Sequence, residues 1–153
     1  MAPAVSERRA GFVLPARQRT RIERWAEAAA PLEACGVLLG RWDSPNRVRV
    51  GGVTRAENLA RRFDRFELHP ADWVRAETCA RALGAQALGF WHSHPRTRAF
   101  PSARDLQGLP GGYCCAILGL HPRGTSELRV FRSELQGEEG GRMVEFQVLL
   151  PQG

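Results

Sequence analysis

The chain has 153 residues, 43% apolar and 25% charged, an ordinary globular balance that excludes disordered and fibrous proteins. Its length suits one domain over residues 1–153, and no run approaches the roughly 18 apolar residues of a membrane span. Residues 1–12 lack the apolar core of a secretory signal, so we expect a cytoplasmic protein without a membrane partner.

The formal charge of +6 comes from 22 basic residues, all of them arginine, against 16 acidic residues. Residues 41–104 hold 12 arginines and 6 acids, so the excess lies in the middle of the chain. This stretch neither alternates basic and aromatic residues, as a groove for single-stranded nucleic acid does, nor contains a recognition-helix pattern. We therefore do not expect a nucleic-acid partner. The sequence carries no signal for an oligomeric state.

The first half of the chain predicts one helix among several strands. A short edge strand is expected over 11–14, and apolar residues at helical spacing predict a helix over 17–30. The continuous apolar run over 35–40 predicts a buried strand, and alternation over 47–53 predicts a half-exposed strand beside it. A short strand over 65–68 completes this half.

The second half begins with a helix from His69 to Gly84, with a proline in its first turn. A central strand is expected over 86–91, then a loop over 95–101 and a short helix that starts at Ser102. Three more strands are predicted, over 113–120, 128–132 and 143–150. Helices interspersed with six or more strands predict a mixed α/β fold around one sheet.

The most informative segment reads W-H-S-H-P at residues 91–95. Side chains two apart on a strand share a face, so we expect His92 and His94 to project together from the strand end. Imidazole is the common zinc ligand, and a carboxylate can supply a third position, here Asp105 in the first turn of the next helix. Two histidines and an aspartate leave a fourth position for water, as in catalytic zinc sites.

Each part of this pattern also has a structural interpretation. An H-x-H pair alone is weak, since two surface histidines have the same spacing. Ser102 and Asp105 match a capping box, in which a serine and an acid three residues later satisfy the first N–H groups of a helix. Both roles are compatible, because one oxygen of Asp105 can bind a metal while Ser102 begins the helix. His69 and His121 precede prolines and are expected to be structural or solvated.

Together these residues resemble the JAMM metalloprotease family, also called JAB or MPN-plus. Glu33 precedes the strand C-G-V-L-L-G, H-S-H-P follows, and seven residues separate His94 from the S-x-x-D at 102–105. The resemblance covers most of the chain. It implies a single-domain α/β/α sandwich with a mixed sheet, similar to the cytidine deaminase architecture. It also implies that His92, His94 and Asp105 bind one zinc ion. Glu33 then accepts a proton from the attacking water, and Ser102 helps hold the substrate carbonyl or its oxyanion.

The resemblance further implies a substrate, a peptide or isopeptide bond after the C-terminal Gly-Gly of a ubiquitin-like protein. The chain has no spare length for the insertions of eukaryotic deubiquitinases, so it resembles the small stand-alone prokaryotic members, which act on ubiquitin-like sulfur carriers. Two alternatives remain: a non-catalytic scaffold of the same fold, and a two-His-one-carboxylate iron oxygenase, whose usual ligand order is the reverse. The hydrolysis needs no thiol, so the four cysteines, which form no C-x-x-C pair, are expected to be bystanders.

Part of the arginine excess falls near the expected metal site. Several arginines fall in segments that flank the expected metal site, namely Arg55, Arg61, Arg62, Arg65, Arg96, Arg98 and Arg104. We expect some of them to meet an acidic carrier surface or a substrate carboxylate, which would speed the encounter in a salt-sensitive way.

Overall fold

The computed structural model describes residues 10–62, 64–121, 124, 126–134 and 142–152. The described elements are, in chain order, β1 (Gly11–Val13), α1 (Ala16–Ala29), β2 (Cys35–Ser44), β3 (Arg47–Ala56), α2 (Pro70–Ala82), β4 (Gln86–His94), α3 (Ala103–Gly108), β5 (Cys114–Leu120), β6 (Ser126–Glu134) and β7 (Arg142–Leu149). The three predicted helices are present, and several strands run longer than the sequence indicated. None of the helices in the described ranges is long and apolar enough to cross a bilayer.

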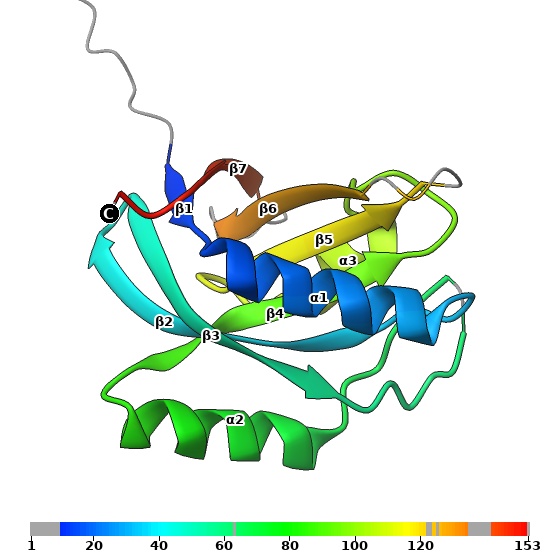
Figure 1. Ribbon diagram of the computed structural model, residues 1–153, viewed down its shortest axis with the longest axis horizontal. Helices are drawn as coiled ribbons and strands as arrows, with labels where there is room; N and C mark the ends of the chain where they lie inside the picture. The colour runs from blue at the N-terminus through cyan, green and yellow to red at the C-terminus, as the bar shows by residue number, and fades with distance from the viewer. Residues whose placement is uncertain (1–9, 63, 122–123, 125, 135–141, 153) are drawn as a thin grey trace, which may run out of the picture.

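All the described strands belong to one sheet in the order β1-β3-β2-β4-β5-β6-β7, which closes on itself (Figure 1). Its closure depends on the three residues of β1, which pair in parallel with both β3 and β7. The segment over 11–14, expected at an edge, is therefore internal. β4 pairs in parallel with β5 and antiparallel with β2, so the predicted mixed sheet is confirmed. The closed sheet differs from an open three-layer sandwich, because β1 joins what would be its two edges.

The two longer helices cover opposite faces of this sheet (Figure 1). α1 buries Ile22 and Ala26 in the main core, to which every described strand contributes. α2 buries Ala76 and Ala80 against Val37 and Leu39 of β2. Residues next to each other in a strand point to opposite faces, so β2 must be apolar on both sides. This explains the unbroken run V-L-L in the chain.

The predicted strand over 65–68 is wrong. In the described structure this segment forms only one isolated bridge, between Asn58 and Leu68. The Asn58 side chain occupies the local backbone groups instead: its amide donates to the Arg65 carbonyl, and its oxygen accepts from the Glu67 N–H. A side chain that bonds nearby backbone groups in this way competes with a strand ladder. His69, expected to be structural or solvated, caps α2 by accepting from the Ala71 N–H at 3.1 Å.

Gly36 of β2 is placed where no side chain fits. A Cβ atom there would clash with the Thr54 carbonyl oxygen and with the Trp91 indole, which hydrogen-bond each other at 2.8 Å. We expect Gly36→Ala to lower the free energy of unfolding by more than about 3 kcal/mol, or to abolish the folding transition, in a denaturant titration. Gly51→Ala is the control, since nothing lies within 4 Å of a Cβ there. A Gly36→Ala protein as stable as wild type would refute this packing.

Candidate metal centre

β4 continues three residues beyond its predicted end at 91, so both histidines of the H-x-H pair lie within the strand. As expected, they share a face, and their Nε2 atoms are 3.2 Å apart. The His92 side chain is fully buried and that of His94 nearly so. Because both side chains are buried, the pair is not two surface histidines, the alternative interpretation of the H-x-H spacing. The strand therefore presents two imidazole nitrogens at one point in the interior.

The short helix α3 brings a carboxylate to the same point. Ser102 caps the helix: its Oγ accepts from the Asp105 N–H at 3.2 Å, and its own N–H donates to Asp105 Oδ2 at 2.8 Å. The capping box is thus present. The same Oδ2 atom lies 3.2 Å from His92 Nε2 and 3.3 Å from His94 Nε2. Asp105 therefore takes part in the helix cap and contacts both histidines at the same time, as the sequence allowed.

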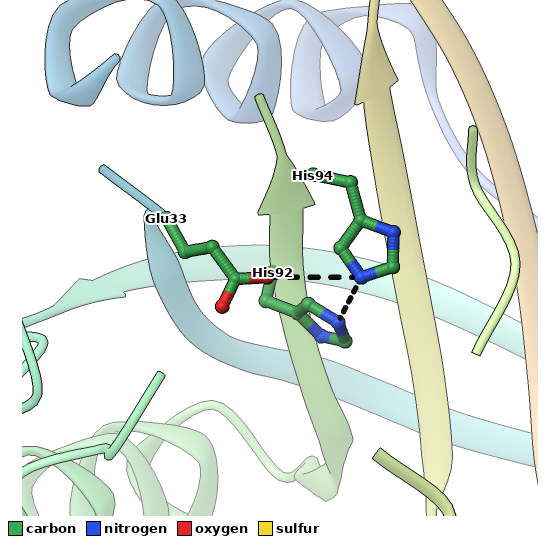
Figure 2. Close-up of side chains that lie close together, drawn as sticks. All are labelled: Glu33, His92 and His94. Carbon is green, nitrogen blue, oxygen red and sulfur yellow. Dashed lines mark hydrogen bonds and ion pairs between the residues drawn. The ribbon is translucent and has the colours of Figure 1, made fainter. Parts of the chain in front are cut away.

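Glu33 enters from the segment before β2 and points toward the histidines (Figure 2). Its side chain is buried, and Oε1 lies 3.7 Å from His94 Nε2. Glu33, His92 and His94 each offer one ligand atom, all within 4.8 Å of one another, and could hold a metal ion. The register of the sheet explains this meeting, because Cys35 of β2 pairs with His92 of β4.

The arrangement fits a zinc ion on two observations. His92 Nε2, His94 Nε2 and Asp105 Oδ2 form a triangle with sides of 3.2–3.3 Å. A tetrahedral zinc ion with bonds of about 2.0–2.1 Å holds its ligand atoms about 3.3–3.4 Å apart. In addition, Glu33 Oε2 is one of the few buried side-chain atoms of the described chain without a hydrogen-bond partner. A buried carboxylate oxygen without a hydrogen-bond partner lowers the stability of the fold unless another group, such as a metal-bound ligand, contacts it.

Hydrogen bonds to the far sides of the rings orient both histidines. His94 Nδ1 lies 2.9 Å from the Arg98 carbonyl oxygen, which can only accept, so Nδ1 carries the proton and a neutral ring turns the Nε2 lone pair inward. The loop that carries the Arg98 carbonyl passes close to Gly119 of β5, where a Cβ atom would come within 3.0 Å of the Ala99 nitrogen. His92 Nδ1 contacts Cys115 Sγ at 3.7 Å. Cys115, expected to be a bystander, thus touches a candidate ligand.

The charges at the centre follow from burial and these contacts. Burial raises the pKa of Glu33 to about 8, although nearby His94 lowers it in part. Burial lowers the pKa of His92. Burial also acts to lower the pKa of His94, but the contacts with Asp105 and the Arg98 carbonyl outweigh burial, so the pKa of His94 is raised. Burial would also raise the pKa of Asp105, but hydrogen bonds with both histidines hold it well below its usual range.

Two residues that position Glu33 were not assigned this role from the sequence. Ser93 Oγ accepts from the Ala34 N–H at 2.8 Å, and the Asn58 amide donates to the Glu33 carbonyl at 2.9 Å. The Glu33 N–H donates in turn to the Arg62 carbonyl at 3.0 Å. Ser93 could have been suspected, because a hydroxyl between two buried histidines needs a partner. No local signal points to Asn58.

We expect Ser93→Ala to lower the free energy of unfolding by roughly 1–3 kcal/mol, because it leaves the buried Ala34 N–H without its acceptor. Chemical denaturation measures the change. Ser133→Ala, at another buried serine in β6, is the comparison and should cost less. Equal stability of the Ser93→Ala and wild-type proteins would contradict the role given to this hydroxyl.

Two cavities border the centre. One of about 500 Å³ lies beside Glu33 and is lined in part by Arg55 and Arg61. The other, of about 440 Å³, lies beside His92 and Asp105. Among the seven flanking arginines, the structure pairs Arg61 with Glu57, Arg62 with Asp64 and Arg98 with Glu127. Arg65 and Arg104 line the second cavity.

The chain is similar to several known proteins. A desampylase of Haloferax volcanii is 36% identical over 77 residues, which is 50% of this chain and 54% of that protein. A desampylase of Pyrococcus furiosus is 27% identical over 82 residues, 54% of this chain and 55% of that protein. The alignments thus span about half the length of these relatives.

Two solution structures resemble the whole fold. A protein from Desulfitobacterium hafniense superposes with a TM-score of 0.79 at 29% identity, over 93% of this chain and 94% of that one. A protein from Salinibacter ruber gives a TM-score of 0.66 at 25% identity, over 92% and 91%. The family model for prokaryotic homologues of the JAB domain matches residues 15–133, a range that contains both histidines, Asp105 and Glu33. Because that match covers well over half of the chain, the protein belongs to the family of prokaryotic JAB-domain homologues.

Proposed function

We propose that this protein is a zinc-dependent peptidase or isopeptidase that hydrolyses the bond after the C-terminal Gly-Gly of a ubiquitin-like carrier. The observation that carries the proposal is the convergence of two buried imidazoles and one carboxylate beside a second carboxylate with an unpaired oxygen. The desampylase names of two relatives support a ubiquitin-like partner. We further propose a carrier of the sulfur-carrier type and action in the cytoplasm.

His92, His94 and Asp105 would hold the zinc ion, which supplies a Lewis acid that makes water more acidic and polarises a carbonyl oxygen. The protein contributes the fixed directions of its ligand atoms. The Arg98 carbonyl holds the His94 ring, and the Ser102 N–H and the α3 cap hold the Asp105 carboxylate. Glu33 stays outside this triangle, with Oε1 3.7 Å from His94 and Oε2 without a partner.

Glu33 then acts as the general base and acid. Its carboxylate takes a proton from the attacking water, whose oxygen bonds to the carbonyl carbon of the last glycine, and passes the proton to the leaving nitrogen as the C–N bond breaks. Ser102 Oγ accepts from the Asp105 N–H, so its own hydroxyl hydrogen stays available to donate to the oxyanion. The products are a carrier ending in a glycine carboxylate and a free amine.

The test uses a bacterial sulfur-carrier protein extended after its Gly-Gly by a short peptide. We expect intact-mass spectrometry to show cleavage directly after Gly-Gly with the zinc-loaded protein, and none after chelation. Metal analysis of the purified protein should find zinc. Bound iron without zinc would favour the oxygenase alternative, and zinc-loaded protein that leaves every such fusion intact would favour the scaffold.

Cleavage of the carrier should also depend on salt. The arginine excess of residues 41–104 would attract an acidic carrier, so we expect kcat/KM to fall about tenfold between roughly 0.05 and 0.5 M NaCl. The value of kcat at saturating carrier should change little, because steering acts on the encounter. Equal kcat/KM values across this range would show that the arginines do not guide the carrier.

A further inference from the structure

The loop over 95–101 joins the two elements that carry the proposed zinc ligands. It starts directly after His94, the last residue of β4, and ends at the cap of α3, the helix that carries Asp105. Within this loop the Arg98 carbonyl oxygen accepts from the Phe100 N–H at 2.9 Å and also lies 2.9 Å from His94 Nδ1. The position of this one carbonyl group therefore sets the direction of the His94 ring.

A side chain from a distant strand contacts the middle of the loop. Glu127 of β6 accepts from the Arg98 guanidinium at 3.2 Å through Oε1, and from the Ala99 N–H at 3.4 Å through Oε2. Each carboxylate oxygen thus bonds one of two consecutive loop residues. Ala99 is fully buried in a cluster with Ile117 and Phe131. The loop is therefore attached to the sheet both by apolar packing and by the Glu127 carboxylate.

Glu127 belongs to a charged network on the outer face of β6 and β7. Arg129 lies 3.9 Å from Glu127 and donates two hydrogen bonds to Glu145, at 2.7 and 2.8 Å. The guanidinium groups of Arg98 and Arg129 lie over the Phe100 ring, 5.3 and 4.2 Å from its centroid. This explains why a phenylalanine that is 45% exposed has a defined place in the loop. A single exposed ion pair stabilises little, but a network with a bidentate arginine and a shared aromatic ring stabilises more.

We propose that Glu127 is a positioning residue for His94, which acts by holding the Arg98 carbonyl against the imidazole ring. Glu127 lies outside the triangle of ligand atoms and takes no part in the proton transfers of the hydrolysis. It restricts the ring to the orientation in which Nε2 faces the other two ligand atoms. The inference rests on the proposed function and goes beyond it, because zinc affinity then depends on a side chain of β6. Removal of a group that orients a metal-bound histidine typically weakens metal binding or activity 10- to 100-fold.

The first experiment measures the zinc dissociation constant of the full chain by competition with a chromophoric chelator. Glu127→Gln can still accept from the Ala99 N–H but loses the charge that attracts Arg98, so we expect roughly 3- to 10-fold weaker binding. Glu127→Ala loses both contacts and should bind zinc roughly 10- to 100-fold more weakly. Glu134→Gln is the matched control, because it removes the same charge from an ion pair with Arg132 on the same strand, and it should bind as wild type. Equal zinc affinity of the Glu127→Ala and wild-type proteins would overturn the proposal.

The second experiment separates positioning of the loop from a general loss of stability, and it uses the metal-free protein. Amide hydrogen exchange is followed by NMR spectroscopy. Glu127→Ala should raise the exchange rate of the Phe100 N–H at least about tenfold, because this N–H donates to the Arg98 carbonyl. The Leu14 N–H, which donates to the Leu149 carbonyl at 2.9 Å, should keep its rate.

The outcomes distinguish the proposal from the proposed function. If both exchange rates rise together, Glu127 only stabilises the fold, and the positioning role fails. If the wild-type protein binds no zinc but the Phe100 N–H alone responds to Glu127→Ala, the zinc-dependent function fails and the attachment of the loop by Glu127 stands.

Discussion

Glu33→Gln should lower kcat by about 10²- to 10⁴-fold, because an amide of the same shape cannot take a proton from water. The side chain is buried with one oxygen free, so the substitution keeps its volume and removes only the basic group. KM and zinc content should change little, since Glu33 lies outside the triangle of ligand atoms. The measurement is steady-state cleavage of the Gly-Gly fusion, with metal content determined on the same samples.

Glu27→Gln, on the exposed face of α1, is the matched control and should behave as wild type. A Glu33→Gln protein that cleaves within tenfold of wild type would remove Glu33 from the mechanism. Loss of zinc together with activity would make Glu33 a ligand instead, in line with its place among the three residues whose ligand atoms lie within 4.8 Å.

Asp105→Asn should abolish the stabilisation that zinc provides. A ligand at 100 times its Kd stabilises the folded state by about 2.7 kcal/mol. For a domain of this size, that amounts to about 5–11 °C in Tm. Chelation should therefore lower the Tm of the wild-type protein by about this amount. The Asp105→Asn protein should begin near the chelated value and respond little to either zinc or chelator, because one corner of the triangle is a neutral amide.

Asp43→Asn, at an exposed carboxylate of β2 that pairs with Arg49, is the control and should keep the full response to zinc. Differential scanning calorimetry with and without chelator gives both values. If the Asp105→Asn protein bound zinc as tightly as wild type, the metal would have to use Glu33 with the two histidines.

The structural features of this site that could be predicted are short-range. His92 and His94 share a face because strand side chains alternate, and Ser102 and Asp105 form a cap because three residues span the first turn of a helix. Each geometry follows from the chain within four residues. The same holds for the helices: apolar spacing predicts α1, and the side chains of His69 and Ser102 cap α2 and α3. Glu33 has no such signal, and only its resemblance to a family motif pointed to it.

The sequence by itself therefore determined the mixed α/β class, the histidine pair and the capped aspartate, because these depend on local backbone periodicity. The tertiary structure alone decided that Glu33 meets the histidines, since this contact requires the register of β2 against β4. It also decided that β1 closes the sheet, that Asn58 bonds Glu33 and Ser93 bonds the next residue, Ala34, and that Arg65 lines a cavity beside His92. Such contacts join residues far apart in the chain, and they exist only once strand pairing has set which segments are neighbours.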